Sequence, residues 1–171
     1  MTYTTYYSSP LGKMILVSDG AALTELDFAE DGLPASVEHT QKDLPVFEEV
    51  FRWLDLYFSG RDPGTLPPLA PHGTAFQQAV WNILRGIPYG TTTTYGRIAA
   101  HIAAARGGRM SAQAVGGAVG RNPISILIPC HRVIGTDGSL TGYAGGLDKK
   151  EALLRLEGVH LPPTAAETLQ E

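Results

Sequence analysis

Residues 95–120 read YGRIAAHIAAARGGRMSAQAVGGAVG, and this stretch decides the fold of the second half of the chain. Apolar residues recur at helical spacing over about 95–105, and the glycine pair at 107–108 ends the helix that this spacing predicts. Ser111 is a good N-cap for a second helix, which we expect to stop near Gly120. Two helices joined by a short turn that contains glycine are typical of a helix-turn-helix.

The second predicted helix is unusually slim for a surface helix. Its interior contains Gly116 and Gly117, and each glycine costs about 1 kcal/mol relative to alanine at such a position. One interpretation is that these residues pack closely against a neighbouring helix. The other is that they approach the wall of a DNA groove, since a helix this slim could enter even the minor groove, which is about 6 Å wide before any widening.

The mostly apolar run Ile124–Ile128 leads into the tetrapeptide Pro129-Cys130-His131-Arg132, which is the most informative segment for chemistry. A lone cysteine is usually an inert packing residue. Here, however, a histidine that can remove the thiol proton follows Cys130, and nearby positive charge favours the thiolate, which is the nucleophile. Neighbouring side chains of an extended chain point to opposite faces, so His131 reaches Cys130 only in a turn or through a water molecule.

The composition is that of an ordinary globular protein, with 43% hydrophobic and 18% charged residues in a chain of 171. No apolar run reaches the roughly 18 residues that a membrane-spanning helix needs, and residues 1–7 carry no basic region and no apolar stretch. We therefore expect no membrane partner and no secretory signal. The single cysteine excludes an internal disulfide and a cysteine-based zinc site, and it fits a reducing cytoplasm.

Charge is divided unevenly along the chain. The net charge of −4 alone argues against a nucleic-acid partner, but residues 1–68 hold four Lys/Arg and eleven Asp/Glu, whereas residues 69–171 hold nine and six. No carboxylate lies between Asp62 and Asp137. One interpretation is chance combined with a buried core, and the other is a surface kept free of negative charge so that it can meet phosphates. The arginines of this acid-free stretch are Arg85, Arg97, Arg106, Arg109, Arg121 and Arg132.

The first half of the chain predicts a small α/β unit. Residues 13–28 are typical of a β-hairpin, because an apolar segment precedes the turn signal Asp19-Gly20 and an alternating strand follows it. Apolar residues of 46–58 fall on one helical face, and Gly60 stops this helix. A proline-rich stretch at 61–72 is a connector, and the charge changes sign across it. We therefore divide the chain into an N-terminal α/β domain at residues 1–68, a C-terminal domain at 69–160 and a loose tail at 161–171.

Further signals complete the second half, which is predicted to be mainly helical. An apolar stripe at 76–84 predicts a helix that precedes the turn Ile87-Pro-Tyr-Gly90. Asp148 with Glu151 three residues on is a capping signal for a last helix, which Gly158 closes.

The hexapeptide Ile128-Pro-Cys-His-Arg-Val133 resembles the active-site signature of the O6-alkylguanine-DNA alkyltransferases, also called methylated-DNA–protein-cysteine methyltransferases. The resemblance is strong over residues 74–158, whereas residues 1–60 match only in general pattern. The further segments that carry it are Ser9-Pro-Leu-Gly12, Phe76-Gln-Gln, Ile87-Pro-Tyr-Gly90, Asn122-Pro123, Tyr143-Ala-Gly-Gly146 and Leu153-Leu-Arg-Leu-Glu157-Gly158.

The resemblance implies a ribonuclease-H-like N-terminal α/β domain, built from an antiparallel sheet and a helix, and a mainly helical C-terminal domain that contains the helix-turn-helix. It also implies that the partner is double-stranded DNA with an alkylated guanine. The second helix of the motif would enter the minor groove, and the damaged base would be flipped into a pocket, because its reacting atom cannot be reached inside the stack. The protein would be a monomer without cofactor or metal, associated with the nucleoid when bound to DNA.

The implied reaction is irreversible, single-turnover transfer of an alkyl group from O6-alkylguanine, and from O4-alkylthymine, to Cys130. Glu157 would orient His131, and His131 would activate Cys130 through a water molecule. This is the logic of a Ser-His-Asp triad with sulfur as the attacking atom. Tyr95 would donate a hydrogen bond or proton to the departing guanine, and Asn122 would act as a hinge ahead of the cysteine.

The resemblance implies two further groups of residues. Backbone groups of Cys130, Val133 and Ala144 would read the edge of the base, and the substrate-binding group consists of Val133, Tyr143, Ala144 and Gly145. The group that meets DNA consists of Arg109, Ala112, Gln113, Ala114, Gly116, Arg121 and Arg132.

The sequence departs from the family's usual pattern at two positions. Gln113 stands where an arginine usually fills the space left by the flipped base. Glutamine is shorter and uncharged, but its amide can still hydrogen-bond an orphaned cytosine, and Arg109, one turn earlier, could supply the charge. Ala144 stands where the family often has serine, and because it keeps its backbone N–H, only a side-chain contact is lost.

Three rival functions stay open at this point. A sibling class binds alkylated DNA and marks it for other repair, but its members lack the cysteine that this chain has. A Cys-His hydrolase would regenerate Cys130, whereas a transferase would not. A DNA-binding regulator with a structural cysteine would retain every activity after Cys130→Ser.

Overall fold

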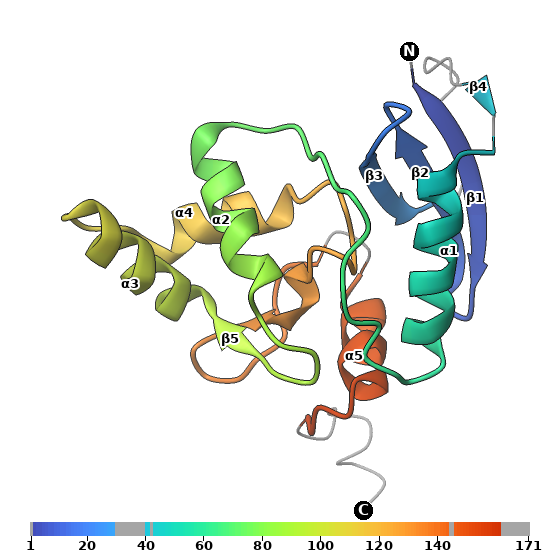
Figure 1. Ribbon diagram of the computed structural model, residues 1–171. Helices are drawn as coiled ribbons and strands as arrows, with labels where there is room; N and C mark the ends of the chain where they lie inside the picture. The colour runs from blue at the N-terminus through green and yellow to red at the C-terminus, as the bar shows by residue number, and fades with distance from the viewer. Residues whose placement is uncertain (1, 30–39, 42, 144–145, 162–171) are drawn as a thin grey trace, which may run out of the picture.

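The computed structural model describes residues 2–29, 40–41, 43–143 and 146–161. A sheet with one helix lies on one side of the molecule, a group of helices lies on the other, and the last helix runs between them (Figure 1). This is the predicted fold class, an α/β N-terminal part followed by a mainly helical part. None of the helices in the described ranges is long and apolar enough to cross a membrane.

Four strands form the N-terminal sheet, namely β1 (Tyr3–Ser9), β2 (Gly12–Ser18), β3 (Leu23–Phe28) and β4 (Thr40–Gln41), in the order β3-β2-β1-β4. Neighbours pair antiparallel, except that β4 is parallel to β1. The predicted hairpin is confirmed as β2 and β3, but its turn is longer than the two residues predicted, because Ser18 pairs with Leu23. The Asp19 carboxylate holds this longer turn by accepting from the N–H groups of Ala21 and Ala22, both at 2.9 Å.

Helix α1 (Pro45–Phe58) lies along this sheet (Figure 1). Pro45 stands at the start of the helix, where a missing N–H is not needed, and Gly60, with φ 84°, follows its end as predicted. Tyr7 of β1 stacks on Phe51 and Phe58 of α1, with ring centroids 5.9 and 6.3 Å apart. The buried face of α1 consists of Val46, Phe47, Val50, Trp53, Leu54 and Tyr57.

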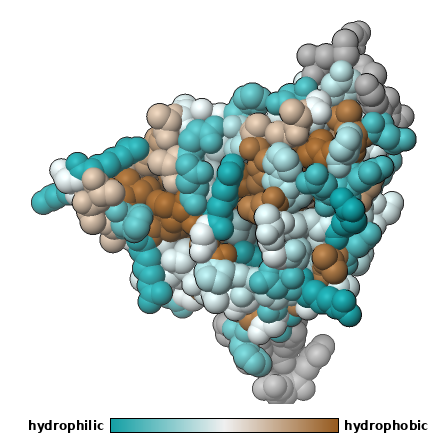
Figure 2. All heavy atoms as spheres, in the orientation of Figure 1, coloured by the Kyte–Doolittle hydropathy of each residue, from teal (hydrophilic) through white to brown (hydrophobic). Residues whose placement is uncertain are grey.

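The second half contains helices α2 (Ala75–Arg85), α3 (Tyr95–Arg106), α4 (Ala112–Gly120) and α5 (Leu147–Leu156), the 3-10 turn η1 (Cys130–Arg132), and the short parallel strands β5 (Thr93–Thr94) and β6 (Val133–Ile134). Helices α3 and α4 are the two predicted helices of the helix-turn-helix. Gly107 ends α3 in the left-handed region, with φ 72°, and Ser111 caps α4 by accepting from the Ala114 N–H at 3.0 Å. On the face seen in Figure 2, apolar side chains gather where α3 meets α2.

Backbone hydrogen bonds join the two parts of the molecule along β3. The N–H of Leu26 donates to the Pro123 carbonyl at 2.9 Å, and the N–H of Ser125 donates back to the Leu26 carbonyl at 2.8 Å. The chain segment that leads to Cys130 is therefore fastened to the N-terminal sheet. Because of this attachment, the position of the cysteine depends on both parts of the protein.

The predicted cap of the last helix was wrong. Helix α5 begins at Leu147, with Gly146 at its N-cap, and no side chain caps it. Gly146 adopts φ 104°, which a residue without a Cβ tolerates. Asp148 is consequently inside the first turn, where a carboxylate complements the helix dipole. The predicted end is confirmed, since Gly158 follows the helix with φ 85°.

Packing inside the protein does not require the glycines of α4. A Cβ built on Gly117 would meet no atom within 4 Å. A Cβ on Gly116 would meet only ring carbons of Tyr95, at the ordinary contact distances of 3.8 and 3.9 Å. Close packing against a neighbouring helix therefore does not explain these residues. The interpretation that is left is a close approach of α4 to another molecule.

We expect Gly117→Ala to raise the free energy of unfolding by about 1 kcal/mol, because alanine is the better helix former and its methyl group has open space. Urea denaturation at neutral pH measures this change. Gly107→Ala is the matched control: the space around it is equally open, but its φ of 72° strains any residue with a Cβ, so this variant should lose stability. A destabilised Gly117→Ala protein would show instead that the fold itself needs the glycine.

Candidate active site

The predicted nucleophile lies at the beginning of a turn. Cys130 is the first residue of η1 and is buried, with 7% of its surface exposed. The turn is closed by the Arg132 N–H, which donates to the Pro129 carbonyl at 3.0 Å. The chain at His131 is therefore turned rather than extended, which is one of the two arrangements that let its imidazole act on the neighbouring thiol.

Asn122 fixes the loop ahead of the cysteine. Its side-chain amide donates to the carbonyls of Ile124 and Ile128, at 3.1 and 2.7 Å, and its oxygen accepts from the Ile124 N–H at 3.0 Å. These bonds close the loop around Ile126, whose φ of 71° lies in the left-handed region that β-branched residues rarely adopt. Asn122 therefore sets the path by which the chain enters Cys130.

The Cys130 thiol is protonated at rest. Burial raises its pKa above the usual range, while the Asn122 amide and the charge of Lys150 act in the opposite direction without overcoming the effect of burial. Since the thiolate is the nucleophile, this cysteine needs a base beside it before it can react.

The Glu157 carboxylate is the centre of a buried hydrogen-bond network. Its Oε2 lies 2.6 Å from Nε2 of His131 and accepts from the Tyr57 hydroxyl, also at 2.6 Å. Its Oε1 accepts from Nε of Arg132 at 2.8 Å and from the Gly90 N–H at 3.0 Å. Each carboxylate oxygen thus has two partners, which uses the full acceptor capacity of the group.

The charges of this network determine which nitrogen of His131 carries the proton. Burial alone would raise the pKa of Glu157, but the hydrogen bonds and charges of His131 and Arg132 outweigh it and lower the pKa to about 2. Burial also lowers the pKa of His131, against the opposing effect of Glu157. At neutral pH an ionised carboxylate, which can only accept, faces a neutral imidazole, so Nε2 is the protonated nitrogen. Nδ1 keeps its lone pair and is buried without a hydrogen-bond partner among the described residues.

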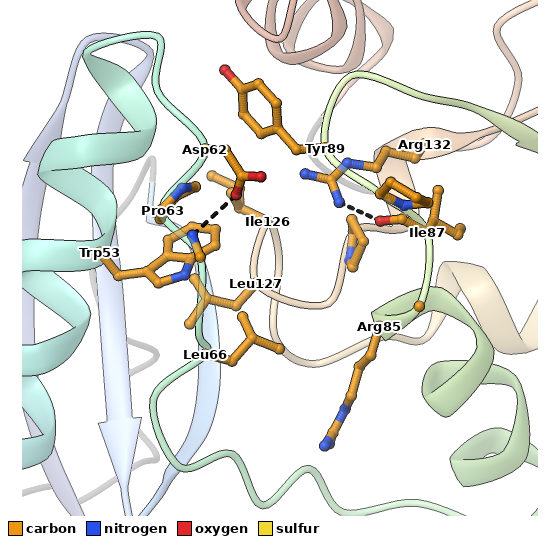
Figure 3. A pocket seen from close by; sticks show the side chains of 14 residues that line it. Trp53, Asp62, Pro63, Leu66, Arg85, Ile87, Tyr89, Ile126, Leu127 and Arg132 are labelled. Carbon is orange, nitrogen blue, oxygen red and sulfur yellow. Dashed lines mark hydrogen bonds between the residues drawn. The ribbon is translucent and has the colours of Figure 1, made fainter.

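Arg132 was predicted to meet DNA, and this prediction is wrong. The residue is only 7% exposed, and its guanidinium donates to Glu157 and to the Ile87 carbonyl, each at 2.8 Å. Figure 3 shows it at a cavity of about 230 Å³ that Trp53 and Tyr89 also line. Because this guanidinium neutralises a buried carboxylate, it is not available to a phosphate outside.

Lys150 is a site residue that was not predicted from the sequence. It is fully buried, and its ammonium donates to the carbonyls of Val133 and Thr141, at 2.6 and 2.8 Å. Burial lowers its pKa to about 8, against the opposing effect of Cys130. Its position was recognisable in principle, because Lys150 lies three residues before Leu153 and so shares the buried face of α5.

Tyr57 is the second site residue that was missed. Its place in the apolar stripe of 46–58 marks it as a core residue, which it also is. Nothing in the sequence connects it with Glu157, which lies 100 residues further along the chain.

A pocket of about 720 Å³ lies beside α4 and brings several predicted site residues together. Tyr95 donates from its hydroxyl to the Thr141 carbonyl at 3.0 Å. Burial raises the pKa values of Tyr95 and Tyr143, and the Cys130 thiol raises both further, so both phenols lie within electrostatic reach of the sulfur. The predicted residues that line this pocket are Tyr95, Ala112, Gln113, Gly116 and Tyr143.

The remaining predicted residues lie around this pocket or outside the described ranges. Val133 follows η1, and its carbonyl is bound to Lys150, whereas Ala144 and Gly145 are not among the described residues. The residues Arg109, Ala114 and Arg121, in or beside α4, are exposed. Neither arginine forms an ion pair with another described residue. The same ranges contain no group of three or more His, Cys, Asp or Glu side chains that could hold a metal ion.

We expect Glu157→Gln to destabilise the protein by about 3–5 kcal/mol, because Arg132 loses its buried counter-charge and an amide offers only one acceptor oxygen. The pKa of Glu157 falls on folding from its usual 4.5 to about 2, so its contribution to stability is complete above 4.5 and is lost as the pH falls through 2. Urea denaturation from pH 7 to pH 2 should show this loss in the wild type but not in Glu157→Gln.

A carboxylate of α5, the helix that Glu157 directly follows, provides the control for this substitution. Glu151 accepts from Arg155 at 2.8 Å in a partly exposed pair four residues apart, so Glu151→Gln should cost less than about 1 kcal/mol. Equal free energies of unfolding for the wild type and Glu157→Gln at pH 7 would contradict the network described above.

Two family models match the chain. Residues 2–69 match the ribonuclease-like domain of 6-O-methylguanine DNA methyltransferase, and residues 75–159 match its DNA binding domain. Among curated proteins, the methylated-DNA–protein-cysteine methyltransferase of Haemophilus influenzae is 48% identical over 159 residues, which cover 92% of this chain and 87% of that protein. The Mycobacterium tuberculosis protein of the same name is 44% identical over 154 residues, which cover 90% and 91%.

Solved structures agree with these matches. The crystal structure of the Mycobacterium tuberculosis O6-methylguanine methyltransferase has a TM-score of 0.81 and 41% identity, and the match covers 100% of both chains. A crystal structure of Mycobacterium tuberculosis OGT in complex with DNA has a TM-score of 0.77 and 41% identity over 99% of both chains. The resemblance found in the sequence is thus confirmed, and the chain belongs to the 6-O-methylguanine DNA methyltransferase family.

Proposed function

We propose that this protein repairs DNA by transferring the alkyl group of O6-alkylguanine to Sγ of Cys130, irreversibly and once per molecule. The observation that carries the proposal is a buried thiol that precedes a neutral histidine, whose Nε2 is held by an ionised glutamate and whose Nδ1 is free to accept a proton. The names of the curated relatives support it, as does the complex with DNA of the related Mycobacterium tuberculosis protein.

The reaction proceeds by proton transfer followed by substitution at carbon. Nδ1 of His131 accepts the thiol proton of Cys130 through a bridging water molecule, and Glu157 stabilises the imidazolium that forms. The thiolate attacks the alkyl carbon, and the C–S bond forms as the bond to O6 breaks. The departing guanine takes the bonding electrons and accepts a hydrogen bond or proton from Tyr95. Because a thioether is not readily hydrolysed, the protein is not regenerated.

The flipped base lies in the pocket beside α4. Backbone groups of Cys130, Val133 and Ala144 read its edge, and Tyr143 and Gly145 complete the substrate loop. Lys150 supports this arrangement, because its ammonium binds the Val133 carbonyl and a carbonyl of the segment that leads to Tyr143. Its positive charge near Cys130 also favours the thiolate over the thiol.

Helix α4 enters the minor groove of the damaged duplex. Its small residues allow the close approach that packing inside the protein does not explain: Ala112, Ala114 and Gly117 are exposed, and Gly116 is half-buried. Arg109 and Arg121 stand beyond its two ends with their charges unpaired among the described residues, so they can meet phosphates. Base flipping is required because the reacting atom is enclosed in the stack.

A second substrate, the oligomeric state and the cellular location complete the proposed function. O4-alkylthymine is the second substrate, since its alkyl group is also carried by an exocyclic oxygen. The protein acts as a monomer in the cytoplasm, at the nucleoid. Residues 1–68 form an N-terminal domain, and residues 69–160 form the domain that binds DNA and transfers the alkyl group. Residues 161–171 are a tail that lies almost wholly outside the described residues.

Intact mass spectrometry after mixing with a duplex that carries O6-methylguanine tests the proposal. We expect each protein molecule to gain one methyl group, located on Cys130 by peptide mapping, and no more in excess DNA. Cys130→Ser should bind the same duplex and gain no methyl group, because a hydroxyl is a much weaker nucleophile than a thiolate. Removal of several methyl groups per protein molecule without added thiol would point to a hydrolase instead.

Gln113 gives a second prediction, because it is exposed in the first turn of α4 and lines the pocket. If it occupies the gap after base extrusion, Gln113→Ala should slow repair of duplex DNA by about fivefold, the equivalent of one lost hydrogen bond. Reaction with the free base O6-benzylguanine, which needs no flipping, should be spared, and Gln113→Arg should preserve or improve duplex repair. The measurement is the ratio of the two second-order rate constants, and an equal fall in both would show that Gln113 supports the pocket or the fold instead.

A further inference from the structure

We infer that Tyr57, from the N-terminal part of the chain, is a positioning residue for the transfer reaction: its hydroxyl holds the Glu157 carboxylate against His131 and governs how readily the imidazole accepts the thiol proton. This inference rests on the roles proposed above for His131 and Glu157. It makes the N-terminal part a contributor to the chemistry, in addition to its structural contact with the loop ahead of Cys130.

Tyr57 and His131 share one acceptor, Oε2 of Glu157. The residue is fully buried, and its hydroxyl donates to Oε2 of Glu157 at 2.6 Å, the same oxygen that lies 2.6 Å from Nε2 of His131. The Tyr57 oxygen is itself only 3.3 Å from that nitrogen. The three polar groups therefore form a closed triangle, in which no partner can change its charge or position without affecting the other two.

Aromatic neighbours hold the Tyr57 ring in place. Trp53 stacks on it, with centroids 5.5 Å apart and planes 8° apart, and Phe58 and Tyr89 pack edge-on at 5.3 and 6.1 Å. His131 also meets the ring edge-on, at 6.4 Å. These contacts on the face and the edges of the ring hold it in place, so the hydroxyl oxygen stays beside Glu157. A tyrosine needed only for packing could be a phenylalanine at this buried position.

The hydroxyl acts on His131 through the charge on Oε2. Burial raises the pKa of Tyr57 and the charge of Glu157 raises it further, so the phenol stays protonated and can only donate to the carboxylate. Its donation weakens the field that Oε2 exerts on the imidazole. The other charged groups that act on His131 are Glu157 itself, which favours the imidazolium, and Arg132 and Lys150, which oppose it. Without the hydroxyl the balance moves toward the imidazolium, so the pKa of His131 should rise.

Tyr57→Phe tests the inference, because it removes one oxygen and keeps the ring. The neutral imidazole is the base, so transfer is lost as the pH falls through the pKa of His131, and a raised pKa moves this loss to higher pH. We expect the acid limb of the rate profile for O6-benzylguanine to move to higher pH in Tyr57→Phe. At a pH below both pKa values, a pKa of His131 that is higher by one should lower the rate roughly tenfold. The free base isolates the chemistry from DNA binding.

Tyr7→Phe is the matched control. The Tyr7 hydroxyl also donates to a carboxylate at 2.6 Å, that of Asp55 on α1, but it lies on the outside of the same part of the protein. This variant should keep the wild-type pH profile. A Tyr57→Phe profile that coincides with the wild type, or a rate that falls equally at every pH, would overturn the inference.

Two further measurements separate this inference from the proposed function and from a failure to fold. If His131→Ala transfers as fast as the wild type, the proposed relay itself is wrong, whereas a slow His131→Ala with an unchanged Tyr57→Phe profile removes only Tyr57. Nitrogen-15 spectra of the wild-type imidazole need no variant at position 57. A neutral His131 protonated at Nε2 is expected, and one protonated at Nδ1 would overturn the arrangement of the triangle.

Discussion

The buried carboxylate of Glu157 is the constraint on which the rest of the site depends. A carboxylate out of water is costly unless a counter-charge and hydrogen bonds compensate it, and removing one partner of such a pair leaves a severe penalty. Its four donors come from α1, from the turn after α2 and from η1. Because these segments meet only in the folded chain, the network joins the two parts of the molecule and fixes the imidazole of His131 against Glu157.

The same burial explains the state of the cysteine. A buried thiol is held in its protonated form, and it needs a base before it can react as a nucleophile. His131 is buried as well, and burial keeps its imidazole neutral, so that Nδ1 can accept a proton. Lys150 is the one buried cation near the sulfur that is not paired with a carboxylate among the described residues, and its bonds go to carbonyls instead. Its charge is thus available to the thiolate when that forms.

The sequence was sufficient to predict those helix boundaries that depend only on residues close together in the chain. Ser111 and Gly107 were recognisable as helix boundaries because capping and the left-handed conformation depend on a few neighbouring residues. The cap of α5 was not, since Asp148 and Glu151 formed a plausible capping pattern while Gly146 took the position. Cys130 and His131 were found because they are adjacent in sequence. Tyr57 and Lys150 were missed because they reach the site through tertiary contacts.

Arg132 shows why the pattern of charge in the sequence could not distinguish exposed arginines from buried ones. The stretch between Asp62 and Asp137 contains no carboxylate, so most of its arginines have no acidic residue nearby in sequence. Arg109 and Arg121 consequently stay exposed, and they remain suited to an anionic partner. Arg132, in contrast, is buried and pairs with Glu157, a carboxylate that lies beyond the end of this stretch. The same pattern of charge in the sequence therefore gives two different environments, and only the fold distinguishes the exposed Arg109 and Arg121 from Arg132, which pairs with the buried Glu157.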